Sequence, residues 1–274
     1  MRFRPPVPES SAERLERWRR VLSEAAARSR LLRRVEVVAT TPSTMDLARE
    51  VDPGTFVVCL EQTAGRGRRG RSWFDGGAGV AATAALEMAE DPLLSTRAGL
   101  AMAEAVVPWL GARAGLKWPN DLVVGRRKLG GVLVERRGDR VGVGIGINVD
   151  AIERPSALAG VAVSLAELSE TPPDRLEVAV SLLRGLERWM PSSADEVRRG
   201  WRGRDRLRGR VVRLLDGRIE RRGRVVDIVP DAHVELLLED GRVVRVPAAT
   251  ARVLDAFADP DDRSGVDPEG PNGR

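Results

Sequence analysis

The chain has 274 residues, 42% of them hydrophobic and 31% charged, which is typical of a globular protein with one large core or a large core and a small one. No apolar stretch is long enough to cross a bilayer, and the N-terminal residues lack the apolar core of a signal peptide. We therefore expect a cytoplasmic protein that does not bind membranes. The single cysteine, Cys59, excludes an internal disulfide and a cysteine-based metal cage.

Arginine dominates the basic residues. The net charge is +5, from 45 basic and 40 acidic residues, an excess too small to indicate nucleic-acid binding. Lys117 and Lys128 are the only lysines, and Gln62 is the only glutamine. An ammonium is a compact point charge and a guanidinium is a planar fork, so a retained lysine indicates a place where arginine will not serve. The alternative is chance in small numbers, although both lysines fall in the glycine-rich middle of the chain.

The first part of the chain predicts a helix, a strand and a second, short helix. Apolar residues recur at helical spacing within residues 11–33. Residues 35–40, VEVVAT, have the β-branched character of a strand. Ser43 or Thr44 is a good N-cap, which predicts that the short helix begins there.

The middle of the chain predicts a sheet. Residues 55–61 form a buried type of strand, and residues 79–88 form another. A helix is expected over residues 95–114, with a kink or boundary at Pro108. Within residues 115–150, short β-branched runs are separated by VGRRK and RRGDR, which predict hairpin turns.

The last part of the chain changes from a helical pattern to a strand pattern. Residues 174–190 and 193–201 predict two more helices. From about residue 207, short alternating strands with Gly and Asp turns indicate a small β-barrel of about 50 residues. The polar residues beyond 256 are expected to be disordered.

The loop GRGRRGRSW, residues 65–73, is the most conspicuous candidate site. Its three glycines allow positive φ and close approach of the backbone to a ligand, and its arginines offer forked donors to carboxylate or phosphate. It is neither a Walker A loop nor a dinucleotide fingerprint. An exposed loop in an arginine-rich chain is an equally good interpretation of this run alone.

Three further motifs follow the loop, KWPNDL (117–122), RKLGGVLVE (127–135) and GIGINV (144–149). Together they supply two lysines, two asparagines, an aspartate and bare glycine backbone. Each could be an ordinary turn or strand. Their occurrence as a set favours a binding site for an anionic ligand.

These motifs, with STMDLA (43–48), resemble those of bacterial biotin protein ligases in order and spacing. The resemblance covers about residues 35–190, and the β-rich end is similar to the SH3-like domain of that family. It implies an α+β fold, a mixed β-sheet with packed helices related to class II aminoacyl-tRNA synthetases, plus a small C-terminal SH3-like β-barrel.

The resemblance also implies a division of the chain, into an N-terminal helical segment (1–34), a catalytic domain (35–203), an SH3-like domain (204–256) and a disordered tail (257–274). Family members that repress transcription carry an N-terminal DNA-binding domain, for which residues 1–34 leave no room. We therefore expect a monofunctional ligase that does not bind DNA, either a monomer or a homodimer.

The implied reaction has two steps. Biotin reacts with ATP, carried with Mg²⁺, to give biotinyl-5′-AMP, and the biotin then passes to a lysine of a biotin carboxyl carrier protein or domain of an acyl-CoA or pyruvate carboxylase. By resemblance, the catalytic residues are Arg66, Arg68, Lys117, Asp121 and Lys128. Asp121 would orient or deprotonate the acceptor lysine or help place Mg²⁺, although it could simply cap its turn; no dedicated metal cage is expected.

The resemblance also assigns binding residues. Those expected to contact biotin are Ser43, Thr44, Met45, Gln62, Arg66, Gly67, Arg68, Lys128, Gly130, Gly131 and Gly144. Those expected to contact ATP are Arg66, Arg68, Arg69, Arg71, Trp73, Asn120, Lys128 and Asn148. Met45 departs from the family, which usually has asparagine at that position.

Two other functions fit parts of the sequence. A lipoate-type protein ligase shares the fold and a catalytic lysine, but the arginine-rich loop favours biotin. A non-enzymatic nucleic-acid-binding protein would interleave basic residues with exposed aromatic residues. The chain has no tyrosine and only four phenylalanines, which disfavours that class.

Overall fold

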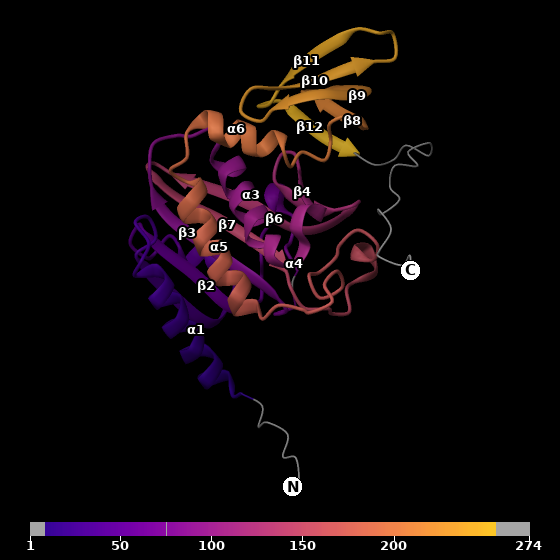
Figure 1. The fold of residues 1–274 in the computed structure, drawn as a ribbon. Helices are drawn as coiled ribbons and strands as arrows, with labels where there is room; N and C mark the ends of the chain where they lie inside the picture. Colours follow the sequence, from indigo (N-terminus) through magenta and orange to yellow (C-terminus); the bar gives the residue numbers. More distant parts are fainter. Residues whose placement is uncertain (1–8, 75, 256–274) are drawn as a thin grey trace.

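The computed structural model describes residues 9–74 and 76–255 (Figure 1). A seven-stranded mixed sheet forms the larger part of the molecule, in the order β1 (Arg34–Thr41), β2 (Thr55–Gln62), β3 (Gly79–Glu87), β7 (Arg140–Asn148), β6 (Arg127–Arg137), β5 (Asp121–Val124) and β4 (Ala114–Lys117). β1 and β2 run parallel, and every other neighbouring pair runs antiparallel. The expected mixed sheet with packed helices is confirmed.

The helices are α1 (Ser11–Ala26), α2 (Thr44–Leu47), α3 (Leu94–Ala105), α4 (Val107–Leu110), α5 (Arg175–Trp189) and α6 (Ala194–Arg202). α1, α3 and α5 cover one face of the large sheet, where α3 and α5 also contact each other. Among the described residues, no helix is long and apolar enough to span a bilayer.

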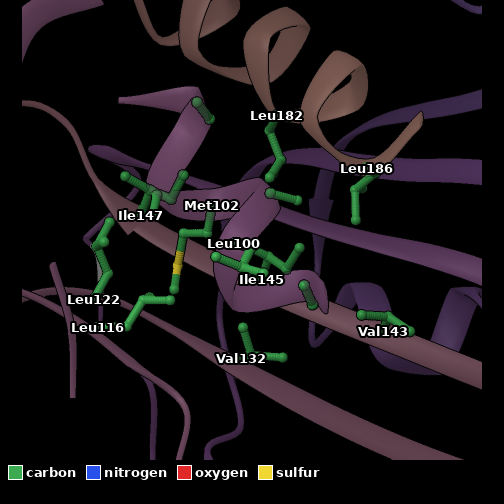
Figure 2. Packing of buried hydrophobic residues seen from close by; sticks show 14 of the residues in the cluster. Leu100, Met102, Leu116, Leu122, Val132, Val143, Ile145, Ile147, Leu182 and Leu186 are labelled. Atoms are coloured by element: carbon green, nitrogen blue, oxygen red, sulfur yellow. The ribbon is translucent and has the colours of Figure 1, made fainter. Parts of the chain in front are cut away.

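The sequence of β7 explains why the two faces of the sheet differ. Side chains alternate across a strand, and residues 142–148 read GVGIGIN. Val143, Ile145 and Ile147 therefore point to one face, where Figure 2 shows them among side chains of α3 and α5. The glycines and Asn148 fall on the opposite face, which leaves that surface of the sheet open at its centre.

The C-terminal strands form a separate five-stranded antiparallel sheet. Its strands are β8 (Val211–Asp216), β9 (Ile219–Val229), β10 (His233–Leu238), β11 (Val243–Pro247) and β12 (Ala251–Asp255), in the order β11-β10-β9-β8-β12. A small antiparallel unit at this end agrees with the expected SH3-like domain.

The segment between the sheets packs on the edge of the large one. The N–H of Leu116 donates to Arg204 O at 2.7 Å, and the N–H of Arg206 donates to Leu116 O at 2.9 Å. Arg198 of α6 forms a forked ion pair with Asp231, which follows β9. These contacts hold α6 between the two sheets (Figure 1).

Two predicted helices were too long. The first ends at Ala26, because the next residues turn to meet α5: Glu187 accepts from the N–H groups of Arg30 and Leu31. The helix predicted over residues 95–114 ends at Ala105 and is followed by the short α4. Pro108 lies at the start of α4, as its missing N–H requires.

Other predicted boundaries hold. Ser43 caps α2, and Gly125 and Gly138 turn the two hairpins with positive φ. The proposed divisions at residues 34 and 203 stay predictions. The tail, residues 257–274, lies outside the described residues.

Candidate active site

The open face of the large sheet holds a cavity of about 250 Å³. Its walls come from α2, the arginine-rich loop, β6 and β7. The predicted residues that line it are Ser43, Thr44, Met45, Gln62, Arg66, Gly67, Arg68, Arg71, Trp73, Asn120, Asp121, Lys128, Gly131, Gly144 and Asn148. Residues far apart in the sequence are therefore brought together around one space.

Three predicted residues do not line this cavity. Lys117 lies at the end of β4, paired in register with Asp121. Arg69 lies at the tip of the loop with φ of 61°. Gly130 faces the helices, because a Cβ there would lie 2.9 Å from Met102 Sδ.

Sequence reasoning missed other lining residues, which are Ser72, Phe74, Ala81, Ala82, Val132, Leu133, Ile145, Gly146, Leu158 and Ala162. The alternation of glycine along β7 is the signal that would have found Gly146. Leu158 and Ala162 lie in a long connection with no motif. They reach the cavity because residues 161 and 163 exchange backbone hydrogen bonds with Lys128.

One end of the cavity is polar. Gln62 Oε1 accepts from the N–H of Thr44 at 2.9 Å and from its hydroxyl at 3.2 Å. Thr83, on β3 beneath them, donates to Thr44 Oγ1 at 2.8 Å. Ser43 Oγ caps α2 by accepting from the N–H of Met45 at 3.3 Å. Amide and hydroxyl groups are thus fixed by their neighbours at the surface of the cavity, ready to recognise a small polar head.

Met45 forms an apolar wall beside that polar end. It is buried, at 4% exposed, and packs against the bare backbone of β7. A Cβ on Gly144 would lie 2.7 Å from Met45 Sδ, and a Cβ on Gly142 would lie 3.1 Å from its Cε. Gly142 and Gly144 are therefore needed to make room for Met45.

The arginine-rich loop folds as a tight hairpin. The N–H of Gly67 donates to Arg71 O at 2.7 Å, and the N–H of Trp73 donates to Gly65 O at 2.8 Å. Trp73 lies across Gly146, where a Cβ would come within 2.4 Å of the indole ring. Its Nε1–H is buried and has no hydrogen-bond partner among the described residues. The loop thus delivers an aromatic ring to the floor of the cavity.

Lys128 lies in the cavity with both a carboxylate and an aromatic ring. Its Nζ is 2.5 Å from Asp121 Oδ1 and 5.6 Å from the centre of the Trp73 ring. A Cβ on Gly131 would lie 3.1 Å from the same Nζ. The ammonium therefore has Asp121, Trp73 and Gly131 close to it on one side, while 38% of the side chain is exposed.

Arg68 differs from Arg66 in its partner. Its Nη1 donates to Asn120 Oδ1 at 3.1 Å, and no carboxylate among the described residues forms an ion pair with it. Burial and the nearby charges of Arg69 and Arg71 lower the pKa of Arg68, against the opposing effect of Asp121. A half-buried cation with a neutral partner keeps its charge available for an anionic ligand.

The two asparagines have structural bonds of their own. Asn120 Nδ2 donates to Val132 O at 2.7 Å, and Asn148 Nδ2 donates to Val163 O at 3.0 Å. Asn148 therefore joins β7 to the connection that carries Leu158. Its Oδ1 is the atom left for a ligand. Among the described residues, no three His, Cys, Asp or Glu side chains gather as they would around a metal ion.

Residues 33–151 match the sequence model of the biotin/lipoate A/B protein ligase family. The chain is also 36% identical over 194 residues to a biotin–acetyl-CoA-carboxylase ligase of Mycobacterium tuberculosis, an alignment that covers 63% of this chain and 72% of that protein. The chain belongs to the biotin protein ligase family.

Other members of the family are similar to this chain over most of its length. The bifunctional ligase/repressor BirA of Escherichia coli is 32% identical over 222 residues, which is 76% of this chain and 68% of that protein. The biotin protein ligase of Aquifex aeolicus in complex with biotin and ATP superimposes with a TM-score of 0.73 at 28% identity, covering 81% of this chain and 99% of that one. The resemblance to biotin ligases is thereby confirmed.

Proposed function

We propose that this protein is an ATP-dependent biotin protein ligase, which adenylates biotin and transfers it to a lysine of a carrier protein. The observation that carries the proposal is the set of groups around one cavity, which has polar groups at Thr44 and Gln62, apolar side chains and cations at Arg68 and Lys128. Biotin calls for the same three kinds of partner, since it has a ureido head, an apolar body and a carboxylate.

The polar end suits a ureido group, which has two N–H donors and one carbonyl acceptor. Hydroxyl groups of Ser43 and Thr44 and the amide of Gln62 offer both kinds of partner. The apolar body would lie along Met45, Leu133 and the β7 glycines. Met45 supplies apolar contact there in place of the amide usual in the family. Gly131 and Gly144 line the cavity, where the lack of a Cβ leaves room for the side chains of Lys128 and Met45.

The cations suit the first chemical step. A biotin carboxylate oxygen attacks the α-phosphorus of ATP, the bond to the bridging oxygen breaks, and pyrophosphate leaves. Both reactants are anions, so their approach requires neutralisation, and charge on the α-phosphoryl oxygens must be stabilised in the transition state. Arg68, from the arginine-rich loop, and Lys128, from β6, both line the cavity and would hold the biotin carboxylate and the α-phosphate.

The nucleotide would occupy the part of the cavity near Trp73 and Asn148. The indole face offers stacking, and Asn148 Oδ1 offers an acceptor to an adenine amino group. Arg71 and Asn120 are the further candidates for phosphate contacts that line the cavity. Arg69, at the tip of the loop, would contribute only through its charge.

In the second step the carrier lysine attacks the mixed anhydride as a free amine, and AMP leaves. Asp121 is the carboxylate among the lining residues, and it would orient that amine or accept its proton. Mg²⁺ generally binds through phosphates and one or two carboxylates. With Asp121 already paired to Lys128, the ion would be held mainly by ATP.

The partner that fits this chemistry is a biotin carboxyl carrier protein or domain, in the cytoplasm. This carrier would belong to an acyl-CoA or pyruvate carboxylase. The neighbours that bind biotin and ATP, and the relatives named as ligases, support the biotin function over a lipoate-type ligase.

The decisive measurement is ATP-dependent transfer of labelled biotin to a carrier-domain fragment. Exchange of labelled pyrophosphate into ATP isolates the first step, and we expect it to depend on biotin. A parallel reaction with lipoate distinguishes the two ligase types. Exchange that depends on lipoate, with none on biotin, would overturn the proposal.

A further inference from the structure

Four charged side chains form a cluster, of which one, Arg66, lines the cavity. Arg66 lies at the base of the arginine-rich loop and makes a forked ion pair with Asp46 of α2, with Nη1–Oδ2 at 2.7 Å and Nη2–Oδ1 at 2.9 Å. Arg49, three residues after Asp46, contacts Asp46 Oδ1 at 2.9 Å and Glu135 Oε2 at 2.5 Å. Glu135 also lies 3.6 Å from Arg66 Nη2.

The cluster contains two cations and two anions, so its net charge is zero. Arg66 therefore offers little uncompensated charge to an anion in the cavity, and both terminal nitrogens of its fork already donate to Asp46. The hydrogen bond from Arg66 lowers the pKa of Asp46, which keeps the carboxylate ionised. Arg68, two residues further along, has the neutral partner Asn120.

The position of Arg66 suits a mechanical role. Arg66 and Ser72 form the antiparallel bridge that closes the base of the loop, two residues before Arg68. Asp46 belongs to α2, the helix whose first residues form the polar end of the cavity. Glu135 belongs to β6, the strand that also carries Lys128. The cluster thus fastens the loop to the elements that contact both ends of the substrate.

We infer that Asp46 is a positioning residue, which holds Arg66 and so fixes the loop that presents Arg68 to the reacting anions. The Arg66 side chain acts through this ion pair, although the residue itself lines the cavity. The inference rests on the proposed function and deepens it. It also separates Arg66 from Arg68, which the sequence motif treats alike.

The first test is Asp46→Asn, with Asp231→Asn as the matched control. Asp231 also forms a forked pair with an arginine, Arg198, but between α6 and the C-terminal sheet. We expect Asp46→Asn to lower kcat for biotin-dependent pyrophosphate exchange by roughly tenfold or more, since small misplacement of a catalytic group has effects of that order. Asp231→Asn should retain the wild-type kcat with a similar change in Tm.

Retention of the intermediate is the second readout. With the loop unfastened, biotinyl-AMP should dissociate faster from Asp46→Asn than from the control. Asp46→Glu keeps the charge and should recover part of both effects. Equal kinetics for Asp46→Asn and Asp231→Asn, on an active wild-type background, would overturn the inference and leave the proposed function intact. Absence of biotin-dependent exchange in the wild type would instead remove the proposed function.

A charge swap separates positioning from direct contact. Arg66→Asp alone places three carboxylates together and should lose nearly all exchange activity. Adding Asp46→Arg restores an opposite-charge pair between the same two elements, and we expect the double variant to be at least roughly tenfold more active than Arg66→Asp. If the double variant is no better than Arg66→Asp while Asp46→Asn also behaves like its control, Arg66 contacts the substrate directly.

Discussion

The arginines of the cavity and those of the C-terminal sheet are the same residue in opposite settings. On the small sheet, Arg213 pairs with Glu220 at 2.7 Å and Arg245 pairs with Glu235 at 2.8 Å, with both guanidinium groups largely exposed. In the cavity, Arg68 is half-buried against the amide of Asn120. On the small sheet, exposed arginines are paired with carboxylates. In the cavity, Arg68 is partly desolvated and has a neutral partner.

The difference teaches that arginine content by itself says little about function. An exposed ion pair is screened by solvent and contributes little to stability or binding. A cation withdrawn from water without a carboxylate partner interacts more strongly with an incoming anion. Substitutions in both regions test this distinction, and we expect the largest effect at Lys128.

Lys128→Arg should reduce biotin-dependent pyrophosphate exchange most severely, by roughly 100-fold or more. The ammonium lies between Asp121, Trp73 and the Cβ-less Gly131, so a planar fork would displace at least one of them. Steady-state exchange kinetics measure the loss. Lys117→Arg is the comparison, because Lys117 does not line the cavity, and its loss should be much smaller. Equal losses would contradict the special role of Lys128.

Arg68→Gly should release biotinyl-AMP and label stray lysines, with adenylate dissociation faster by roughly 10- to 100-fold. The reason is the loss of the uncompensated charge that holds the adenylate. Biotinylation of an unrelated protein in the same solution reports the escape.

The matched control is Arg69→Gly in the same loop. It also removes one positive charge, and φ of 61° at this position suits glycine better than arginine. Retention of the adenylate should therefore stay close to wild type. If both variants leak equally, the total charge of the loop matters and the setting of Arg68 does not.

Asp205 lies in the segment that joins the two sheets and forms a β-bridge with Leu116 of β4. We expect this residue to make the stability of the fold depend on pH. Burial raises the pKa of Asp205 to about 6, with Asp227 adding to the effect, while hydrogen bonds from the backbone of Leu207 and Arg208 oppose it. The folded state therefore binds this proton more tightly than the unfolded state. Stability contributed by this group is present below the unfolded pKa and is lost as pH rises toward 6.

Asp205→Asn should remove that dependence. Its Oδ1 can still accept from the N–H of Leu207, so the turn is retained. We expect Tm of the variant to exceed wild type by a few degrees at about pH 7.5 and to approach wild type at about pH 4. Thermal unfolding across this range measures both. A difference in Tm that does not change with pH would contradict the shifted pKa.

The fold was predicted well wherever the signal was local. The β-branched runs within residues 115–150, the cap at Ser43 and the two hairpin turns each follow from neighbouring residues. The end of α1 at Ala26 was not predictable, because it depends on Glu187, about 160 residues away. A contact of that range leaves no local pattern.

The residues of the site were predicted better than their individual partners. Motifs in the sequence brought the loop, Asp121 and Lys128 into one proposal, and the structure brings them into one cavity. The motif did not distinguish Arg66 from Arg68, because their partners, Asp46 and Asn120, come from different elements. Sequence spacing identifies the donors of a site, whereas tertiary packing decides which of them is neutralised.

Glu220→Gln should have the smallest effect of all. It removes the carboxylate that pairs with Arg213 on the C-terminal sheet, an exposed pair whose two side chains are 50% and 47% exposed. We expect Tm to change by about 1 °C or less and biotin-dependent exchange to equal wild type, since solvent already screens the charges. Differential scanning calorimetry at low and high salt checks this, because a pair that matters would show a loss that shrinks as salt rises. If Glu220→Gln impaired the enzyme as much as Arg68→Gly, the exposed arginine Arg213 would matter for function. The contrast between the two regions would then fail.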